Sequence, residues 1–154
     1  MNITNIKYFC TTNGDGFRTA VFVAGCHIHC KGCFNKAAWD FNTGKILDEE
    51  MIDKILTSIE PEYIEGLSIL GGEPLDPDNQ EGVAELIREF RHRFGMRKNI
   101  WLWTGYTLNN VPDTQYIKYI KGSVDYIIDG PYIESLYNAD LKYRGSSNQR
   151  IIKI

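Results

Sequence analysis

The sequence lacks a long apolar run, and this absence bears on where the protein works. No stretch reaches the ~18 consecutive apolar residues of a membrane-spanning helix. Residues 1–10 have neither the basic start nor the apolar run of a signal peptide. We therefore expect a cytoplasmic protein that contacts no membrane, in a reducing compartment where clustered cysteines act as metal ligands or redox groups and not as structural disulfides.

An excess of positive charge is also missing. The chain has 17 Lys and Arg residues and 20 Asp and Glu residues, and the resulting net charge of −3 argues against a nucleic-acid-binding surface. Neither a repeat, a low-complexity tract nor a linker divides the 154 residues, so we expect a single domain over residues 1–154. A hydrophobic content of 43% suffices for a packed core.

Cysteine is scarce but concentrated. Three of the four cysteines, Cys26, Cys30 and Cys33, fall within eight residues in the spacing C-x3-C-x2-C. Thiolates at this spacing can hold an iron–sulfur cluster. Four thiolates close a cluster, whereas three leave one iron with an open position that can bind and activate a ligand. We interpret Cys10, sixteen residues before the triplet, as a small, partly buried residue; the alternative is a fourth ligand that closes the open position.

A zinc knuckle is the competing interpretation of the triplet. Zinc accepts three cysteines and one histidine, and His27 and His29 lie between the cysteines. On these residues alone, zinc and an iron–sulfur cluster are equally supported. The string Gly71-Gly72-Glu73-Pro74 farther along the chain shifts the balance toward the cluster.

Short apolar runs alternate with amphipathic stretches along the chain. The patterns predict strands at residues 19–24, 67–70, 100–103, 124–128 and 151–154, and helices at residues 48–58, 79–94 and 114–120. Strands that alternate with helices indicate a mostly parallel α/β sheet. Four or five such strands fall short of the eight of a closed barrel. We expect either a curved partial barrel or an open sheet.

Four motifs each follow a predicted strand: the cysteine triplet, Gly71-Gly72-Glu73-Pro74, Thr104-Gly105-Tyr106 and Asp129-Gly130. Ligands of parallel α/β sheets bind at the carboxyl ends of the strands, so these strings predict one site. The two glycines let the backbone approach a ligand closely, and Glu73 can accept a hydrogen bond from an ammonium group. Thr104 and Asp129 are polar residues at points where a buried strand opens. The cysteine triplet follows the first strand.

Taken together, the motifs resemble those of a known enzyme family. The triplet and Gly71-Gly72-Glu73-Pro74 resemble the radical S-adenosylmethionine (SAM) enzymes. Further strings make nearly the whole chain similar to the glycyl-radical-enzyme activases, and among them to the activating subunit of the anaerobic ribonucleoside-triphosphate reductase. These strings are residues 13–18, 33–36, 101–106, 129–132 and 144–149.

The resemblance implies a fold, two cofactors and their ligands. The fold is a curved, mostly parallel sheet that forms an incomplete TIM-like barrel, and the cofactors are a [4Fe-4S] cluster held by the triplet and SAM. One departure concerns the adenine, because Gly32 stands where many radical SAM enzymes have an aromatic residue. We assign no catalytic acid, base or nucleophile. The implied SAM contacts are Gly71, Gly72, Glu73, Thr104, Asp129, Phe34 and Asn35.

The resemblance also implies partners. The protein substrate is the large subunit of the anaerobic reductase, and the electron donor is a reduced protein such as flavodoxin; a homodimer is left open. Residues 13–18 and 144–148 are either surface loops, with Arg18 in a local salt bridge, or a docking rim for a partner's loop. Two alternatives remain: an activase of pyruvate formate-lyase or another glycyl-radical enzyme, and a non-catalytic zinc or iron–sulfur module.

Overall fold

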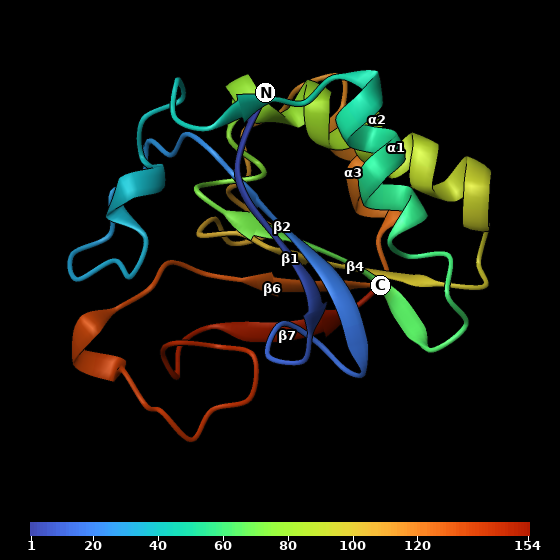
Figure 1. The fold of residues 1–154 in the computed structure, drawn as a ribbon. Helices are drawn as coiled ribbons and strands as arrows, with labels where there is room; N and C mark the ends of the chain where they lie inside the picture. Colours follow the sequence, from blue (N-terminus) through green and yellow to red (C-terminus); the bar gives the residue numbers. More distant parts are fainter.

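The computed structural model describes residues 1–154 as an open, seven-stranded mixed sheet with three helices on one face (Figure 1). Two short 3-10 turns, η1 (Lys36–Ala38) and η2 (Glu134–Leu136), lie in the loops. The helices are α1 (Glu49–Thr57), α2 (Pro77–Phe94) and α3 (Ile117–Ser123). The strands are β1 (Asn2–Cys10), β2 (Phe17–Val23), β3 (Lys45–Ile46), β4 (Ile64–Gly71), β5 (Asn99–Trp103), β6 (Tyr126–Asp129) and β7 (Arg150–Lys153).

The strand order is β3-β1-β2-β4-β5-β6-β7. Strands β2, β4, β5 and β6 are parallel, whereas β1 and β3 on one side and β7 on the other pair antiparallel. The expected incomplete TIM-like barrel is therefore wrong, and so is a mostly parallel sheet, because three of the six pairings are antiparallel. A parallel neighbour requires a long crossover connection, usually a helix. Instead, a short loop joins β1 to β2, and the segment from β6 to β7 contains only η2.

Most expected elements are present, with shifted ends. Helix α1 begins as expected after Asp48, whose side chain accepts a hydrogen bond from the Met51 backbone N–H at 2.8 Å. Helix α2 begins two residues earlier than expected, with Asp76 as its N-cap and proline at its first turn. Helix α3 begins at Ile117 and not at residue 114. Strands β1 and β3 are not predicted by the sequence patterns, since their exposed side chains follow no regular alternation.

The two faces of the sheet differ. The face under the helices carries a core of 24 buried apolar residues, including Val21, Ile69 and Leu102 from three neighbouring strands. The opposite face carries polar and aromatic side chains, among them Ser68 and Trp101, which are buried under loops. No helix in the protein has the length and apolar character needed to cross a membrane.

Arg18 on this opposite face is fully buried. Its guanidinium donates to Ser68 Oγ at 2.7 Å, to Asn99 Oδ1 at 2.7 Å, to the Leu67 carbonyl at 2.8 Å, and to the Asp15 and Asn99 carbonyls. Burial lowers the pKa of Arg18 to about 10, so the group stays charged at neutral pH. The expected surface position of Arg18, in a salt bridge or a docking rim, is therefore wrong. Its hydrogen bonds connect β2 to β4, to β5 and to the loop before β2.

Candidate functional site

A cavity of about 480 Å³ opens at the carboxyl ends of β2, β4 and β5. Its wall comes from the loop after β2, the loop after β4, the start of the loop after β5, and the long segment between β6 and β7. Nine of the ten residues expected to bind the cluster or SAM line this one cavity: Cys26, Cys30, Cys33, Phe34, Asn35, Gly71, Gly72, Glu73 and Thr104.

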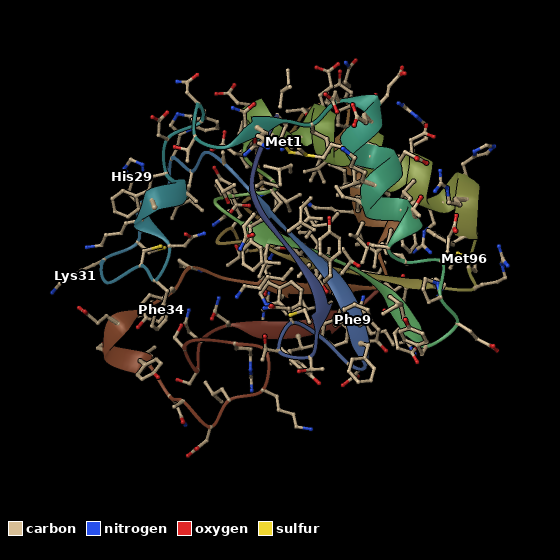
Figure 2. The ribbon with its side chains drawn as sticks, viewed as in Figure 1. Met1, Phe9, His29, Lys31, Phe34 and Met96 are labelled. Atoms are coloured by element: carbon tan, nitrogen blue, oxygen red, sulfur yellow. The ribbon has the colours of Figure 1, made fainter.

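The cysteine loop is folded back on itself. His29 and Gly32 have positive φ angles of 50° and 74°, and the Cys33 N–H donates to the Cys30 carbonyl at 3.1 Å. The Asn35 N–H lies 3.4 Å from Cys33 Sγ, which makes it a donor toward sulfur. These features place all three thiols on the cavity wall. In Figure 2, Phe34 lies between this loop and the segment that carries η2.

The donor set on the wall fits an iron–sulfur cluster with an open position. All four cysteines are free, and Cys10 does not line the cavity; its Sγ lies 3.0 Å from Asn13 Oδ1. Burial raises the pKa of the Cys26 and Cys30 thiols, so a positively charged metal centre is needed to hold them as thiolates. The wall thus offers three sulfur ligands.

The two histidines of the triplet contact other groups. His27 Nδ1 lies 2.9 Å from Asp76 Oδ2, and the His29 ring stacks on Trp39 with ring centroids 4.2 Å apart. Neither histidine lines the cavity. A zinc site of three cysteines and one histidine therefore finds no imidazole on this wall.

The glycine pair brings two loops into close contact. Gly71 has a φ of 120°, and a Cβ added to it would lie 2.5 Å from the Val23 nitrogen. A Cβ on Gly72 would lie 2.3 Å from the Gly25 carbonyl oxygen. Both positions require glycine because the loop after β4 packs directly on the backbone that leads into the triplet. The same two glycines line the cavity, so close packing and close approach to a ligand coincide.

Glu73 joins two strand ends. Its carboxyl group is buried and accepts hydrogen bonds from Thr104 Oγ1 at 2.7 Å, from the Gly105 N–H at 2.7 Å and from the Leu75 N–H at 2.8 Å. Burial raises the pKa of Glu73 to about 7, although these three donors act in the opposite direction. Glu73 and Thr104, both expected to contact SAM, thus bind each other on the cavity wall.

Asp129 is the one expected contact outside the cavity wall. Its buried carboxylate accepts a hydrogen bond from Arg150 Nε at 2.8 Å and another from the Leu108 N–H at 2.9 Å. These bonds tie β6 to β7 and to the loop after β5. The structure therefore gives Asp129 partners within the chain.

Comparison with known proteins agrees with this geometry. A family model for a 4Fe-4S single cluster domain matches residues 12–152. An anaerobic ribonucleoside-triphosphate reductase-activating protein of Enterobacteria phage T4 is 37% identical over 98% of this chain and 93% of its own length. Proteins of the same name from Vibrio cholerae and Escherichia coli K12 are 38% and 35% identical over about nine-tenths of each chain.

The chain belongs to the anaerobic ribonucleoside-triphosphate reductase-activating protein family. The resemblance of the motifs to the activating subunit of the anaerobic reductase is thereby confirmed. The 4Fe-4S domain also favours the iron–sulfur interpretation of the triplet over zinc.

Some wall residues were not expected at the site. Trp39 and Tyr143 line the cavity but follow no predicted strand, and Arg144, expected in a surface loop or docking rim, lines it as well. The Trp103 Nε1–H donates to the Tyr143 carbonyl at 2.7 Å, and the Tyr143 hydroxyl donates to Asp15 at 2.6 Å. These bonds hold the segment between β6 and β7 over the open face of the sheet. The only available signal was the polar string at residues 144–149.

Glu73 should make the stability of the cluster-free protein depend on pH. Its pKa is about 7 when folded against an ordinary value of 4.5, so between these values the folded state binds more protons than the unfolded state. Stability should therefore fall as pH rises from 4.5 to 7, by about 3 kcal/mol at ~1.4 kcal/mol per pKa unit. Denaturant unfolding at pH 5 and pH 8 should show this loss in the wild type, and Glu73→Gln should lack it. Equal losses in both proteins would contradict the assignment.

Proposed function

We propose that this chain activates the anaerobic ribonucleoside-triphosphate reductase by radical SAM chemistry. The observation that carries the proposal is that three thiols and the Gly71-Gly72-Glu73 loop line one cavity. Three thiolates suit a [4Fe-4S] cluster with an open iron. The cavity volume of about 480 Å³ lies in the range of small-molecule and cofactor sites.

Each residue expected to bind the cluster or SAM has a role in this proposal. Cys26, Cys30 and Cys33 hold the cluster, and Phe34 and Asn35, which follow directly on its loop, contact SAM. Gly71, Gly72 and Glu73 bind the methionyl amine, because a buried carboxyl group and close backbone attract an ammonium group. Thr104 orients Glu73 through the 2.7 Å hydrogen bond. Asp129, paired with Arg150, supports the cavity from behind as a positioning residue.

Held by Cys26, Cys30 and Cys33, the cluster would supply one electron to cleave the bond between sulfur and C5′ of SAM. The products would be methionine and a 5′-deoxyadenosyl radical. That radical would take a hydrogen atom from a glycine of the reductase, giving 5′-deoxyadenosine and a glycyl radical. The electron comes from a reduced donor such as flavodoxin. The protein contributes orientation and exclusion of side reactions, while the cofactors carry the radical chemistry.

Anaerobic electron paramagnetic resonance of the reduced, iron- and sulfide-reconstituted protein, with and without SAM, tests the proposal. We expect a [4Fe-4S]⁺ signal that changes on addition of SAM, and SAM consumption under strong reduction. A cluster signal indifferent to SAM would return the triplet to electron transfer or structure. Incubation with purified reductase, and separately with pyruvate formate-lyase, should give a glycyl radical on the reductase alone.

An exposed aromatic rim borders the cavity mouth and is where we place the partner. Phe34 is 74% exposed, and its ring lies 5.0 Å from that of Tyr132 and 5.8 Å from that of Tyr137, between ring centroids. A partner's glycine must enter the cavity to react, so its loop crosses this rim. Phe9, stacked on Tyr63, forms a second exposed aromatic pair away from Phe34 (Figure 2).

Tyr137→Asp should therefore weaken productive docking of the reductase without affecting SAM binding. Tyr137 is about half exposed and does not line the cavity. We expect the KM for the reductase to rise about tenfold, since tyrosine is enriched among the minority of interface residues whose loss costs more than ~1 kcal/mol, and the substitution adds a charge to an aromatic cluster. Tyr63→Asp, at a similarly exposed tyrosine outside the rim, is the matched control and should behave as wild type. An unchanged KM in Tyr137→Asp would exclude the rim as the docking surface.

A further inference from the structure

The cavity wall has one charge of each sign besides the cysteines. Among its 24 residues, Glu73 is the only carboxylate and Arg144 the only Arg or Lys. The wall thus carries one acidic and one basic side chain. A ligand that bears both an ammonium group and a carboxylate would match the two.

Arg144 has unused hydrogen-bond donors. Its Nη1 donates to the Gln149 carbonyl at 2.9 Å, whereas its buried Nε–H has no partner. None of the eight ion pairs of the chain includes Arg144. Native proteins rarely leave a buried donor unpaired, so the Nε–H of Arg144 calls for an explanation, and its residue's place on the cavity wall points to a ligand. Trp39 Nε1, on the same wall, is a second buried donor without a partner.

The polar residues that follow Arg144, at 145–149, have hydrogen-bond partners within the chain, which accounts for their polar character. Gln149 Oε1 accepts the N–H groups of Gly145 and Ser146, and Gln149 Nε2 donates to the Gly130 carbonyl. Asn148 Nδ2 donates to the Pro131 carbonyl at 2.8 Å. These bonds fix residues 145–149 on the end of β6. They hold the Arg144 backbone in place and leave part of its guanidinium free.

We propose that Arg144 binds the carboxylate of the methionyl group of SAM. This inference rests on the proposed function and extends it, because it separates the amine contact at Glu73 from the carboxylate contact. A guanidinium binds a carboxylate through two parallel N–H donors, and its Nε and Nη2 have no partner in the chain. Arg150 is unsuited to this role because it already pairs with Asp129.

Anaerobic equilibrium binding to the cluster-reconstituted protein tests the proposal, with SAM and decarboxylated SAM (the analogue that lacks only the carboxylate) as probes. In the wild type, SAM should bind about 10–100-fold more tightly than the analogue, the range expected for a charge-assisted pair. Arg144→Gln should reduce this preference by weakening SAM alone, and the preference that remains measures binding of the carboxylate to the open iron. Arg144→Lys, which keeps the charge without the planar fork, should retain more of the preference. Lys142→Gln, at an exposed neighbouring cation outside the wall, is the control.

The outcomes separate this inference from the function on which it rests. A wild type that binds neither compound would overturn both. If the wild type binds SAM and Arg144→Gln binds it equally well, or loses both compounds equally, only the role of Arg144 falls. If Arg144→Gln binds SAM as the wild type does but no longer activates the reductase, Arg144 contacts the partner protein and not SAM, and the proposal is wrong. Cluster absorbance of each variant verifies that it is folded.

Discussion

Replacing Cys30 by serine is expected to abolish cluster binding and with it activation of the reductase. The cavity wall offers three sulfur ligands and no fourth cysteine, so no thiol can replace the one removed. Changes to groups that only support metal ligands already cost about 10–100-fold, and loss of a ligand should cost more. Iron and sulfide analysis after anaerobic reconstitution, together with the glycyl-radical yield on the reductase, measures both effects.

Cys10→Ser is the matched control for this substitution. Cys10 is a free cysteine outside the cavity wall, and its Sγ donates to Asn13 Oδ1 at 3.0 Å, a bond that a serine hydroxyl can make. The control should bind iron and sulfide as the wild type does and keep its activity. Loss of the cluster in Cys10→Ser would show that Cys10 is a fourth ligand and would remove the open position. A cluster of normal content in Cys30→Ser would disprove the ligand set.

Arg18→Met is expected to destabilise the protein by about 2–4 kcal/mol. Methionine approximates the length of the side chain but donates no hydrogen bond, so the buried acceptors of Ser68, Asn99 and Leu67 lose a partner. Each buried acceptor left unsatisfied costs about 1–3 kcal/mol, partly offset by the removal of a buried charge. Denaturant unfolding of the cluster-free protein at pH 7 measures the effect.

Two comparisons make the Arg18 result specific. Arg18→Lys keeps the charge but cannot reach three strands and a loop with one ammonium group, so it should be nearly as unstable as Arg18→Met. Arg88→Met removes an exposed arginine whose partner is the neighbouring Glu89, and it should change stability by less than ~0.5 kcal/mol. A loss below ~1 kcal/mol in Arg18→Met would show that water satisfies the acceptors.

Local sequence determined the parts of this protein whose chemistry depends on close spacing. The C-x3-C-x2-C triplet brings three thiols together within one loop, whatever the remainder of the fold. Apolar periodicity located α1, α2 and the parallel strands, because one face of each must enter the core. The strings after these strands met at one cavity because parallel strands end at the same edge of a sheet.

Tertiary structure decided what depends on partners distant in sequence. Whether the sheet curls into a barrel depends on the outer strands, and β1 and β7 pair antiparallel for reasons that no local pattern contains. Arg18 and Arg144 both lie in polar strings that read as surface. Arg18 is buried and bound to residues as distant in sequence as Asn99, whereas Arg144 lines the cavity. Hydrogen bonds to distant residues decide where a charged side chain is satisfied, and no local pattern contains them.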